Sequence, residues 1–271
     1  MRNMTGKTVV ITGGSSGIGA GAARALAKLG AKVVITGRSL ETEKIAREIG
    51  ADFYLVDFAK LEDVRCFARE LLAKYPRLDV LVNNAGSIIS KRRETVDGFE
   101  ATFQVNHLAA FLLTNLLRER LEESGAIIIN TSSLMNTLGR IDFEDLQHSK
   151  SYNDSRAYSN TKLMNILHAM EIAKRFKGVH VASFHPGPVM TAFTREGSWL
   201  ARALYETPLK HLFLITPEKG ADTLVWLVTH QPGEDWVSGE YYHKRKTGRR
   251  SREARADIAE KLWMASEKML S

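Results

Sequence analysis

The chain has 271 residues, 44% of them hydrophobic and 25% charged, which is ordinary for a globular protein that buries a substantial core. No apolar run approaches the roughly 20 residues that a membrane-spanning helix needs, and no signal-peptide segment precedes the first strand-like run. Cys66 is the single cysteine, which excludes an internal disulfide and favours a cytoplasmic protein.

The net charge of +7 is concentrated in one segment, HKRKTGRRSREAR at 243–255. Two interpretations stay open: a solvated basic loop before the last helix, or a surface for a phosphate-rich or membrane partner. Elsewhere both signs of charge are interspersed and no aromatic stacking motif accompanies the cations, so nucleic acid is not expected as a partner. None of the eight histidines stands at metal-ligand spacing from another, so no metal site is expected.

Short Val/Ile-rich segments alternate with longer segments of helical periodicity along the whole chain. Strands are predicted at 7–12, 32–36, 51–56, 79–83, 126–130, 179–184 and 239–243. Helices are predicted at 17–29, 40–49, 60–74, 99–121, 155–176, 217–229 and from about 251. This alternation predicts an α/β fold, a doubly wound parallel sheet with helices on both faces. No linker or repeat interrupts it, so we expect one domain over 1–271.

In such a sheet the ligand lies beyond the carboxyl ends of the strands, and the first strand ends in TGGSSGIG (12–19). Gly13, Gly17 and Gly19 permit a tight turn and a close approach of the backbone to a pyrophosphate at the helix N-terminus. The hydroxyls of Ser15 and Ser16 add hydrogen-bond donors for a phosphate. The spacing G-x-x-x-G-x-G differs from the commoner G-x-G-x-x-G, but its position in the first strand–helix unit supports a dinucleotide site.

Arg38 follows the second predicted strand, 19 positions after Gly19. An acidic residue near this place binds the ribose 2′-hydroxyl of NAD. Arginine instead suits the 2′-phosphate of NADP, which its guanidinium pairs with through two hydrogen bonds. The alternative is a solvated surface arginine. NADP(H) is the predicted cofactor.

Tyr158 and Lys162 in AYSNTK stand four residues apart on a predicted helix, so their side chains share one face. A neighbouring ammonium lowers the pKa of a phenol from its usual value of about 10 toward neutrality, as acid–base catalysis requires. Tyr242 and Lys246 repeat this spacing, but at a strand end that runs into the basic segment. The helix of Tyr158 lies downstream of INTSS, where Ser132 or Ser133 can hydrogen-bond a substrate oxygen.

Together, TGGSSGIG, NNAG (83–86), the serine pair and Tyr158/Lys162 resemble the short-chain dehydrogenase/reductase family over nearly the whole chain. The resemblance implies a reversible hydride transfer between a nicotinamide and a carbonyl or alcohol carbon. It assigns the catalytic positions to Ser133, Tyr158, Lys162 and Asn106. For Asn106 the alternative is that its side chain satisfies backbone groups where a helix bends. It also implies that Tyr158 and Lys162 contact the cofactor, with the remaining contacts at Gly13, Ser15, Ser16, Gly17, Ile18, Gly19, Arg38, Asp57, Phe58, Asn84, Ala85, Gly86, Pro186, Gly187, Val189 and Thr191.

NHLAAFLLT, HPGPVMT, EKLWMASEKML and the 25-residue separation of Ser133 and Tyr158 are similar to the retinol-dehydrogenase-like branch. Ala109-Ala110 depart from the Gly-His usual there. Segments 134–157 and 189–216 are expected to shape a pocket for a bulky apolar carbonyl or alcohol, or else to serve helix packing or oligomer contacts. The alternatives to an enzyme of this branch are a non-catalytic NADP(H)-binding sensor and a sugar epimerase of the extended branch. A homo-oligomer is possible, as is common in the family.

Overall fold

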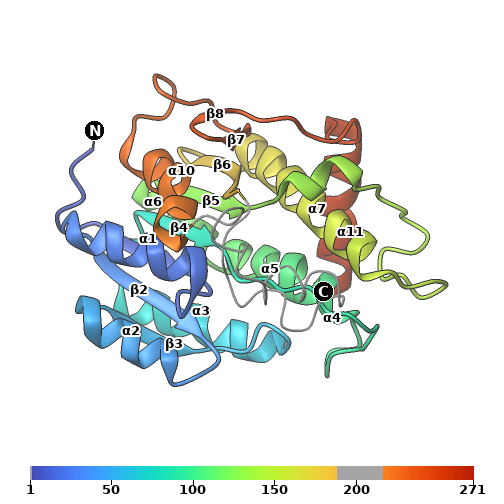
Figure 1. Cartoon of the computed structure of the whole chain (residues 1–271), viewed down its shortest axis with the longest axis horizontal. Coiled ribbons are helices and arrows are strands. Elements are labelled where there is room, and N and C mark those ends of the chain that lie inside the picture. Colours follow the sequence, from blue (N-terminus) through green and yellow to red (C-terminus); the bar gives the residue numbers. More distant parts are fainter. Residues whose placement is uncertain (1, 188–215) are drawn as a thin grey trace.

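The computed structural model describes residues 2–187 and 216–271. Its strands form one eight-stranded sheet of order β3-β2-β1-β4-β5-β6-β7-β8, in which β8 alone runs antiparallel to its neighbour (Figure 1). The strands are β1 (Thr8–Ile11), β2 (Lys32–Gly37), β3 (Asp52–Leu55), β4 (Val80–Asn83), β5 (Ile127–Thr131), β6 (His180–His185), β7 (Tyr241–His243) and β8 (Lys246–Thr247). The predicted doubly wound parallel sheet is confirmed.

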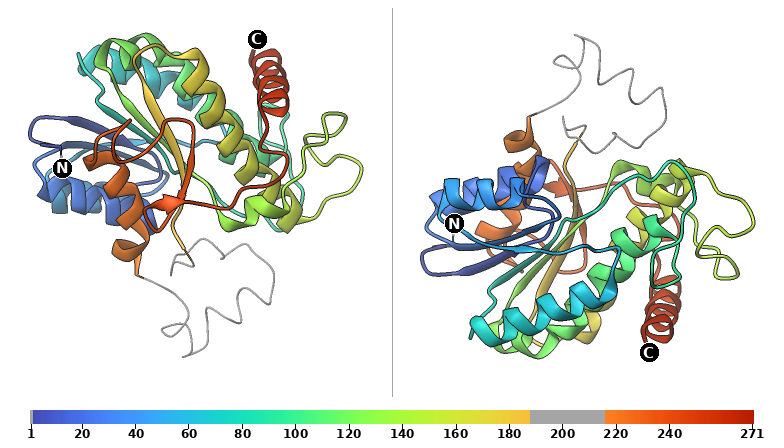
Figure 2. Two further views of the ribbon diagram at one scale, coloured as in Figure 1. Left: turned by 90° about the horizontal axis from the view of Figure 1, so that it is seen from above. Right: turned by 90° about the horizontal axis from the view of Figure 1, so that it is seen from below.

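Helices cover both faces of the sheet (Figure 2). On one face lie α1 (Gly17–Lys28), α2 (Glu41–Ile49) and α10 (Pro217–Thr229). On the other lie α3 (Leu61–Lys74), α5 (Ala109–Leu116), α6 (Arg118–Ser124) and α7 (Asp154–Arg175), and α11 (Ala256–Leu270) packs against α7. Successive residues of a strand serve opposite faces, as Val9 and Val10 do, so a continuous apolar run is buried on both sides.

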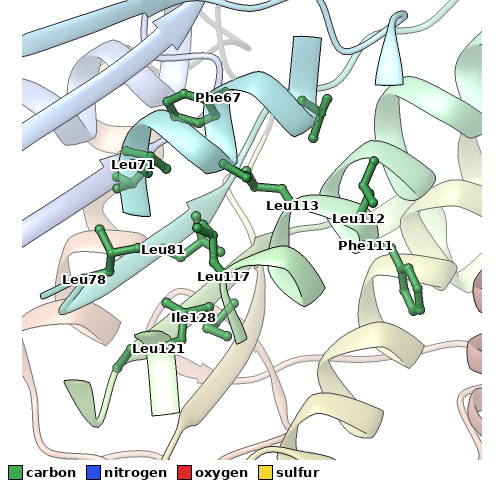
Figure 3. Close-up of a cluster of buried hydrophobic side chains, with 14 of the residues drawn as sticks. Phe67, Leu71, Leu78, Leu81, Phe111, Leu112, Leu113, Leu117, Leu121 and Ile128 are labelled. Carbon is green, nitrogen blue, oxygen red and sulfur yellow. The ribbon is translucent and has the colours of Figure 1, made fainter. Parts of the chain in front are cut away.

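The larger apolar cluster joins the sheet to the helices of the second face (Figure 3). Its side chains come from α3, α5, α6, β4 and β5, and burial of such side chains contributes about 1.5–3 kcal/mol each. Because every central strand is covered in this way, the sheet edge at the carboxyl ends of the strands is the rigid base of the candidate site. The labelled members in Figure 3 are Phe67, Leu71, Leu78, Leu81, Phe111, Leu112, Leu113, Leu117, Leu121 and Ile128.

The prediction of one continuous helix over 99–121 is wrong. The segment contains α4 (Ala101–Phe103), a π-helix η1 (Gln104–Leu108), α5 and the start of α6. The buried carboxylate of Glu100 accepts the backbone N–H groups of Thr102 and Phe103, so the helical segment begins at 101 rather than 99. A π-helical turn inserts an extra residue into a helix and is frequent at functional sites. Here it holds Asn106.

Two smaller differences concern the C-terminal region. The last helix begins at Ala256, five residues later than the predicted start at 251, and the preceding segment makes hydrogen bonds to distant parts of the chain. Strand β8 was not predicted. It follows a two-residue turn in which Lys244 and Arg245 both have positive φ, a turn usually made by Asn-Gly, so the sequence lacked the usual hairpin signal.

Candidate active site

The glycine loop joins β1 to α1, and its glycines are needed for space. A Cβ on Gly13 would lie 3.0 Å from Ala85 Cα, and one on Gly19 would lie 2.2 Å from the Gly13 carbonyl oxygen. Gly13 and Gly17 also have positive φ, which glycine adopts without strain. A side chain at Gly13 or Gly19 would therefore displace the loop or the β4 end beside it.

Thr12 and Asn84 tie the glycine loop to the segment after β4. Thr12 Oγ1 accepts the backbone N–H groups of Asn84 and Ala85 at 2.9 and 3.0 Å. Asn84 Nδ2 donates to the carbonyl oxygens of Thr12 and Gly13 at 3.0 and 3.2 Å. Asn84 was predicted to contact the cofactor, and the structure uses its side chain to hold the loop. Thr12 was missed, although it opens the glycine motif.

The N-terminus of α1 directly follows the glycine loop and is not capped by a side chain. Ser16 is the N-cap residue, but its exposed side chain makes no capping hydrogen bond, and the first turn contains no acidic residue. Backbone N–H groups at a helix start carry a partial positive charge and bind phosphate. The closely packed glycines and this uncapped helix start fit the pyrophosphate of a dinucleotide.

Arg38 lies next to this loop, directly after β2. Gly37 packs so closely against Ser15 that a Cβ there would lie 2.9 Å from Ser15 Oγ. Arg38 itself is exposed and forms no ion pair or hydrogen bond with the residues that the structure describes. A guanidinium that pairs with no carboxylate of the described residues leaves its donors for an anionic group.

Tyr158 and Lys162 lie on one face of α7, as their spacing predicted. The Lys162 ammonium is 5.3 Å from the centre of the Tyr158 ring, and both side chains are buried. Lys162 Nζ donates to the Thr131 carbonyl at 3.1 Å, which also accepts Asn165 Nδ2 at 3.0 Å. Burial lowers the pKa of Lys162 to about 8. Lys162 therefore holds its proton less tightly than an exposed lysine does.

Ser133 and Ser132 have different surroundings at the end of β5. Ser132 is buried and donates to the Lys162 carbonyl at 2.7 Å, so its hydroxyl is a structural link to α7. Ser133 is half-buried, and its Oγ accepts the Met135 N–H at 3.3 Å at the start of η2 (Leu134–Leu138). Within the described chain no group accepts the Ser133 hydroxyl proton, which is therefore available to a ligand oxygen.

Asn106 uses its side chain as a clamp between the π-turn and the segment after β4. Its Oδ1 accepts the Ser87 N–H at 2.8 Å, and its Nδ2 donates to the Ser87 carbonyl at 2.9 Å and to Thr161 Oγ1 at 3.1 Å. The partners are the Ser87 backbone and the Thr161 side chain rather than backbone groups of the bent helix, so Asn106 links this helix to the turn after β4 and to α7. A Cβ on Gly86 would lie 3.0 Å from Asn106 Oδ1 and 3.5 Å from Lys162 Nζ, so the site converges here.

The remaining predicted cofactor contacts lie at two other places on the same edge. Asp57 is half-buried after β3 and its carboxylate accepts the Ala59 N–H at 3.0 Å, while the Phe58 side chain belongs to the apolar core. Gly187 has φ of +88° and donates its N–H to His185 Nδ1 at 3.4 Å, directly after Pro186. Val189, Thr191 and the pocket segment 189–216, apart from Thr216 at the start of α10, lie outside the described residues.

The second tyrosine–lysine pair does not form a comparable site. Tyr242 Oη accepts the Val237 N–H at 2.7 Å, and Lys246 lies exposed on β8, across a turn from it. In the basic segment Arg245, Arg250 and Arg255 pair with Asp222, Glu240 and Asp257, an arrangement that favours a solvated loop. None of the helices in residues 2–187 and 216–271 has the length and apolar character to cross a membrane.

Known proteins are similar to this chain over nearly its whole length. The Streptomyces sp. (strain C5) protein with the provisional name daunorubicin C-13 ketoreductase DnrU is 45% identical, over 97% of this chain and 92% of its own. Retinol dehydrogenase 14 of Mus musculus is 40% identical, over 98% of this chain and 86% of its own. A crystal structure of an uncharacterised protein from Mycobacterium paratuberculosis is 31% identical, with a TM-score of 0.80 over 99% of this chain and 95% of that one.

Residues 7–199 match the sequence profile of the family described as short chain dehydrogenase. The match includes the glycine loop, the segment after β4, the serine pair and Tyr158/Lys162. Members of this family transfer hydride between NAD(P) and a carbonyl or alcohol group. The chain belongs to the short-chain dehydrogenase family and, by its relatives, to the retinol-dehydrogenase-like part of it.

Proposed function

We propose that this protein is an NADP(H)-dependent oxidoreductase that reduces a bulky, mostly apolar ketone or aldehyde to an alcohol. The observation that carries the proposal is the buried Lys162 ammonium beside the Tyr158 ring, together with Ser133 at the end of β5, whose hydroxyl proton no described group accepts. Burying a cation next to a phenol costs free energy, because burial penalises its charge. A catalytic role for the pair explains why the fold accepts this cost. The same observation argues against a sensor that only binds the cofactor.

The residues of the site divide the work on the substrate oxygen. When bound, the nicotinamide cofactor supplies the hydride. Ser133 Oγ, fixed by the Met135 N–H, donates its proton in a hydrogen bond to the carbonyl oxygen, where negative charge develops. Tyr158 delivers a proton to the same oxygen, and the charge of Lys162 stabilises the phenolate that remains. Asn106 holds the Ser87 backbone and Thr161, which keeps the turn after β4 against α7.

The choice of NADP(H) rests on Arg38. Its guanidinium has no partner among the described residues, and its neighbour Gly37 packs against Ser15 in the loop before α1. An arginine at this place pairs with a 2′-phosphate, whereas an acid would pair with a 2′-hydroxyl. Since cells keep the NADP pool largely reduced, reduction is the proposed direction.

The substrate class rests on the residues that follow Ser133. Leu134 and Leu138 are 54% and 67% exposed at the start of the predicted pocket segment 134–157. Apolar side chains beside a polar reaction centre favour a large apolar ligand. The names of two relatives, a daunorubicin C-13 ketoreductase and a retinol dehydrogenase, both refer to large molecules that carry a carbonyl or alcohol group.

A substrate screen tests this function. Oxidation of NADPH and of NADH is followed with polycyclic ketones, retinal, aromatic aldehydes and small polar aldehydes. We expect turnover with NADPH and with at least one bulky apolar carbonyl, and far slower turnover with the small polar ones. Tight NADPH binding without turnover of any carbonyl would instead favour the sensor.

The pH dependence of carbonyl reduction provides a further prediction. Lys162 carries its proton below its pKa of about 8 and loses it above, and only the charged form stabilises the Tyr158 phenolate. We therefore expect kcat/KM to be nearly constant below pH 8 and to fall as the pH rises through it. Lys162→Met should lose this limb together with most of the rate. A wild-type profile that stays flat well above pH 8 would contradict the assignment of Lys162.

A further inference from the structure

Asn136 is a buried amide that contacts the backbone of Ser133 but has no part in the chemistry described above. It lies in η2, three residues after Ser133, and is fully buried. Its Nδ2 donates to the Ser133 carbonyl at 2.7 Å, and its backbone N–H donates to the same oxygen at 3.0 Å. One carbonyl thus accepts two hydrogen bonds from a single residue.

The other end of the Asn136 amide is held by the C-terminal part of the chain. Asn136 Oδ1 accepts the Ser251 N–H at 2.9 Å, and Ser251 Oγ donates to the Gly139 carbonyl at 3.1 Å. Glu253 continues the same connection by accepting the Ile141 N–H at 2.7 Å. We call residues 251–253 the strap. Through Asn136 the strap fixes the turn that carries Ser133, although 115 positions separate Ser251 from Asn136.

We infer that Asn136 is a positioning residue, which holds Ser133 in the orientation that the reaction needs. Ser133 has an extended backbone, with φ of −155° and ψ of 160°, and ψ is fixed by the carbonyl that Asn136 holds. The direction of Oγ follows from this backbone and from the Met135 N–H that it accepts. A hydroxyl donor stabilises an oxyanion only when it points at the oxygen, and a misplacement of 1 Å costs rate.

The inference rests on the proposed function, since it assigns Ser133 to the substrate oxygen. It adds that the serine reaches its full effect on the rate only while a buried amide, outside the catalytic set, connects it to the strap. If Asn136 served the fold alone, its replacement would change kcat by the same factor with and without the Ser133 hydroxyl. If Asn136 acts through Ser133, its replacement should no longer change kcat once that hydroxyl is removed.

A double-mutant cycle separates these roles. The variants are Asn136→Ala, Ser133→Ala and the pair, with Asn136→Asp as a second, isosteric change that replaces the Nδ2 donor by an acceptor. Ser251→Ala is the matched control, because it removes the hydroxyl bond to Gly139 from the strap but keeps the backbone N–H that Asn136 accepts. Each protein is measured for kcat, KM, the isotope effect with deuterated cofactor, cofactor affinity by fluorescence, and melting temperature.

We expect Ser133→Ala to lower kcat by about 10²–10³-fold and Asn136→Ala by about 10-fold, with cofactor affinity unchanged. In the Ser133→Ala background Asn136→Ala should change kcat by less than about 2-fold, although it still lowers the melting temperature. The isotope effect should rise in Asn136→Ala and Asn136→Asp, because a misplaced serine slows the chemical step, and stay at the wild-type value in Ser251→Ala.

Two different failures can be told apart. If Asn136→Ala lowers kcat by the same factor in both backgrounds, or if its isotope effect equals that of wild type, Asn136 serves the fold alone and the inference is wrong. If Ser133→Ala retains wild-type kcat, the proposed role of Ser133 is wrong, and the inference falls with it. If Asn136→Ala does not fold, Asn136→Asp takes its place in the cycle.

Discussion

Tyr158→Phe is expected to reduce carbonyl turnover by about three orders of magnitude while the protein folds and binds NADPH as before. The phenylalanine ring keeps the apolar contacts of the tyrosine on α7 and lacks only the hydroxyl, which is the proposed proton donor to the substrate oxygen. Lys162 remains charged beside the ring, but it has no phenolate to stabilise. Steady-state NADPH oxidation, fluorescence titration with NADPH and thermal melting measure the three quantities.

Tyr242→Phe is the matched control, because it removes a tyrosine hydroxyl that also has a lysine four residues later. The Tyr242 hydroxyl accepts the Val237 N–H, and loss of such a hydrogen bond costs about 1 kcal/mol of stability. The control should therefore melt at a lower temperature and keep its turnover. If Tyr158→Phe retains most of its carbonyl-reductase activity, Tyr158 is not the proton donor.

Arg38→Ala is expected to raise the KM for NADPH by about 10- to 100-fold, which corresponds to the loss of one or two charge-assisted hydrogen bonds to a phosphate. The KM for NADH should stay within about 2-fold, because NADH has no 2′-phosphate for Arg38 to bind. The ratio of kcat/KM for the two cofactors thus falls toward one. Steady-state kinetics with each cofactor at a saturating carbonyl concentration give this ratio.

Arg47→Ala controls for the loss of a surface cation on the same face of the sheet. Arg47 lies on α2, is highly exposed and pairs with Glu43. Its replacement should leave the KM for both cofactors unchanged. Equal effects of Arg38→Ala on NADPH and NADH would show that Arg38 is a solvated surface arginine, and NADP(H) would no longer be the expected cofactor.

The sequence alone determined the order of strands and helices, the glycine loop and the pairing of Tyr158 with Lys162. Each of these depends on residues that are close in the chain. Apolar runs bounded by helical periodicity predict a strand–helix alternation, and a spacing of four places two side chains on one helix face. The resemblance to a known family then pointed to Ser133 and Asn106, but it could not say what each side chain contacts.

The tertiary structure decided how these residues are held. Asn106 lies in a π-turn that helical periodicity could not distinguish from the α-helix predicted over 99–121, because both repeat apolar residues at similar intervals. The low pKa of Lys162 follows from its burial on α7, and its ammonium donates to the carbonyl of Thr131 at the end of β5.

Thr12 and Asn136 show the same limit. Each is a small polar residue beside a recognisable motif, and each acts through backbone groups far away in sequence: Thr12 through the segment after β4, Asn136 through Ser251. Local patterns determine which groups the site contains. Their orientation and their pKa depend on long-range hydrogen bonds and burial, which form only when the sheet and its helices are packed together.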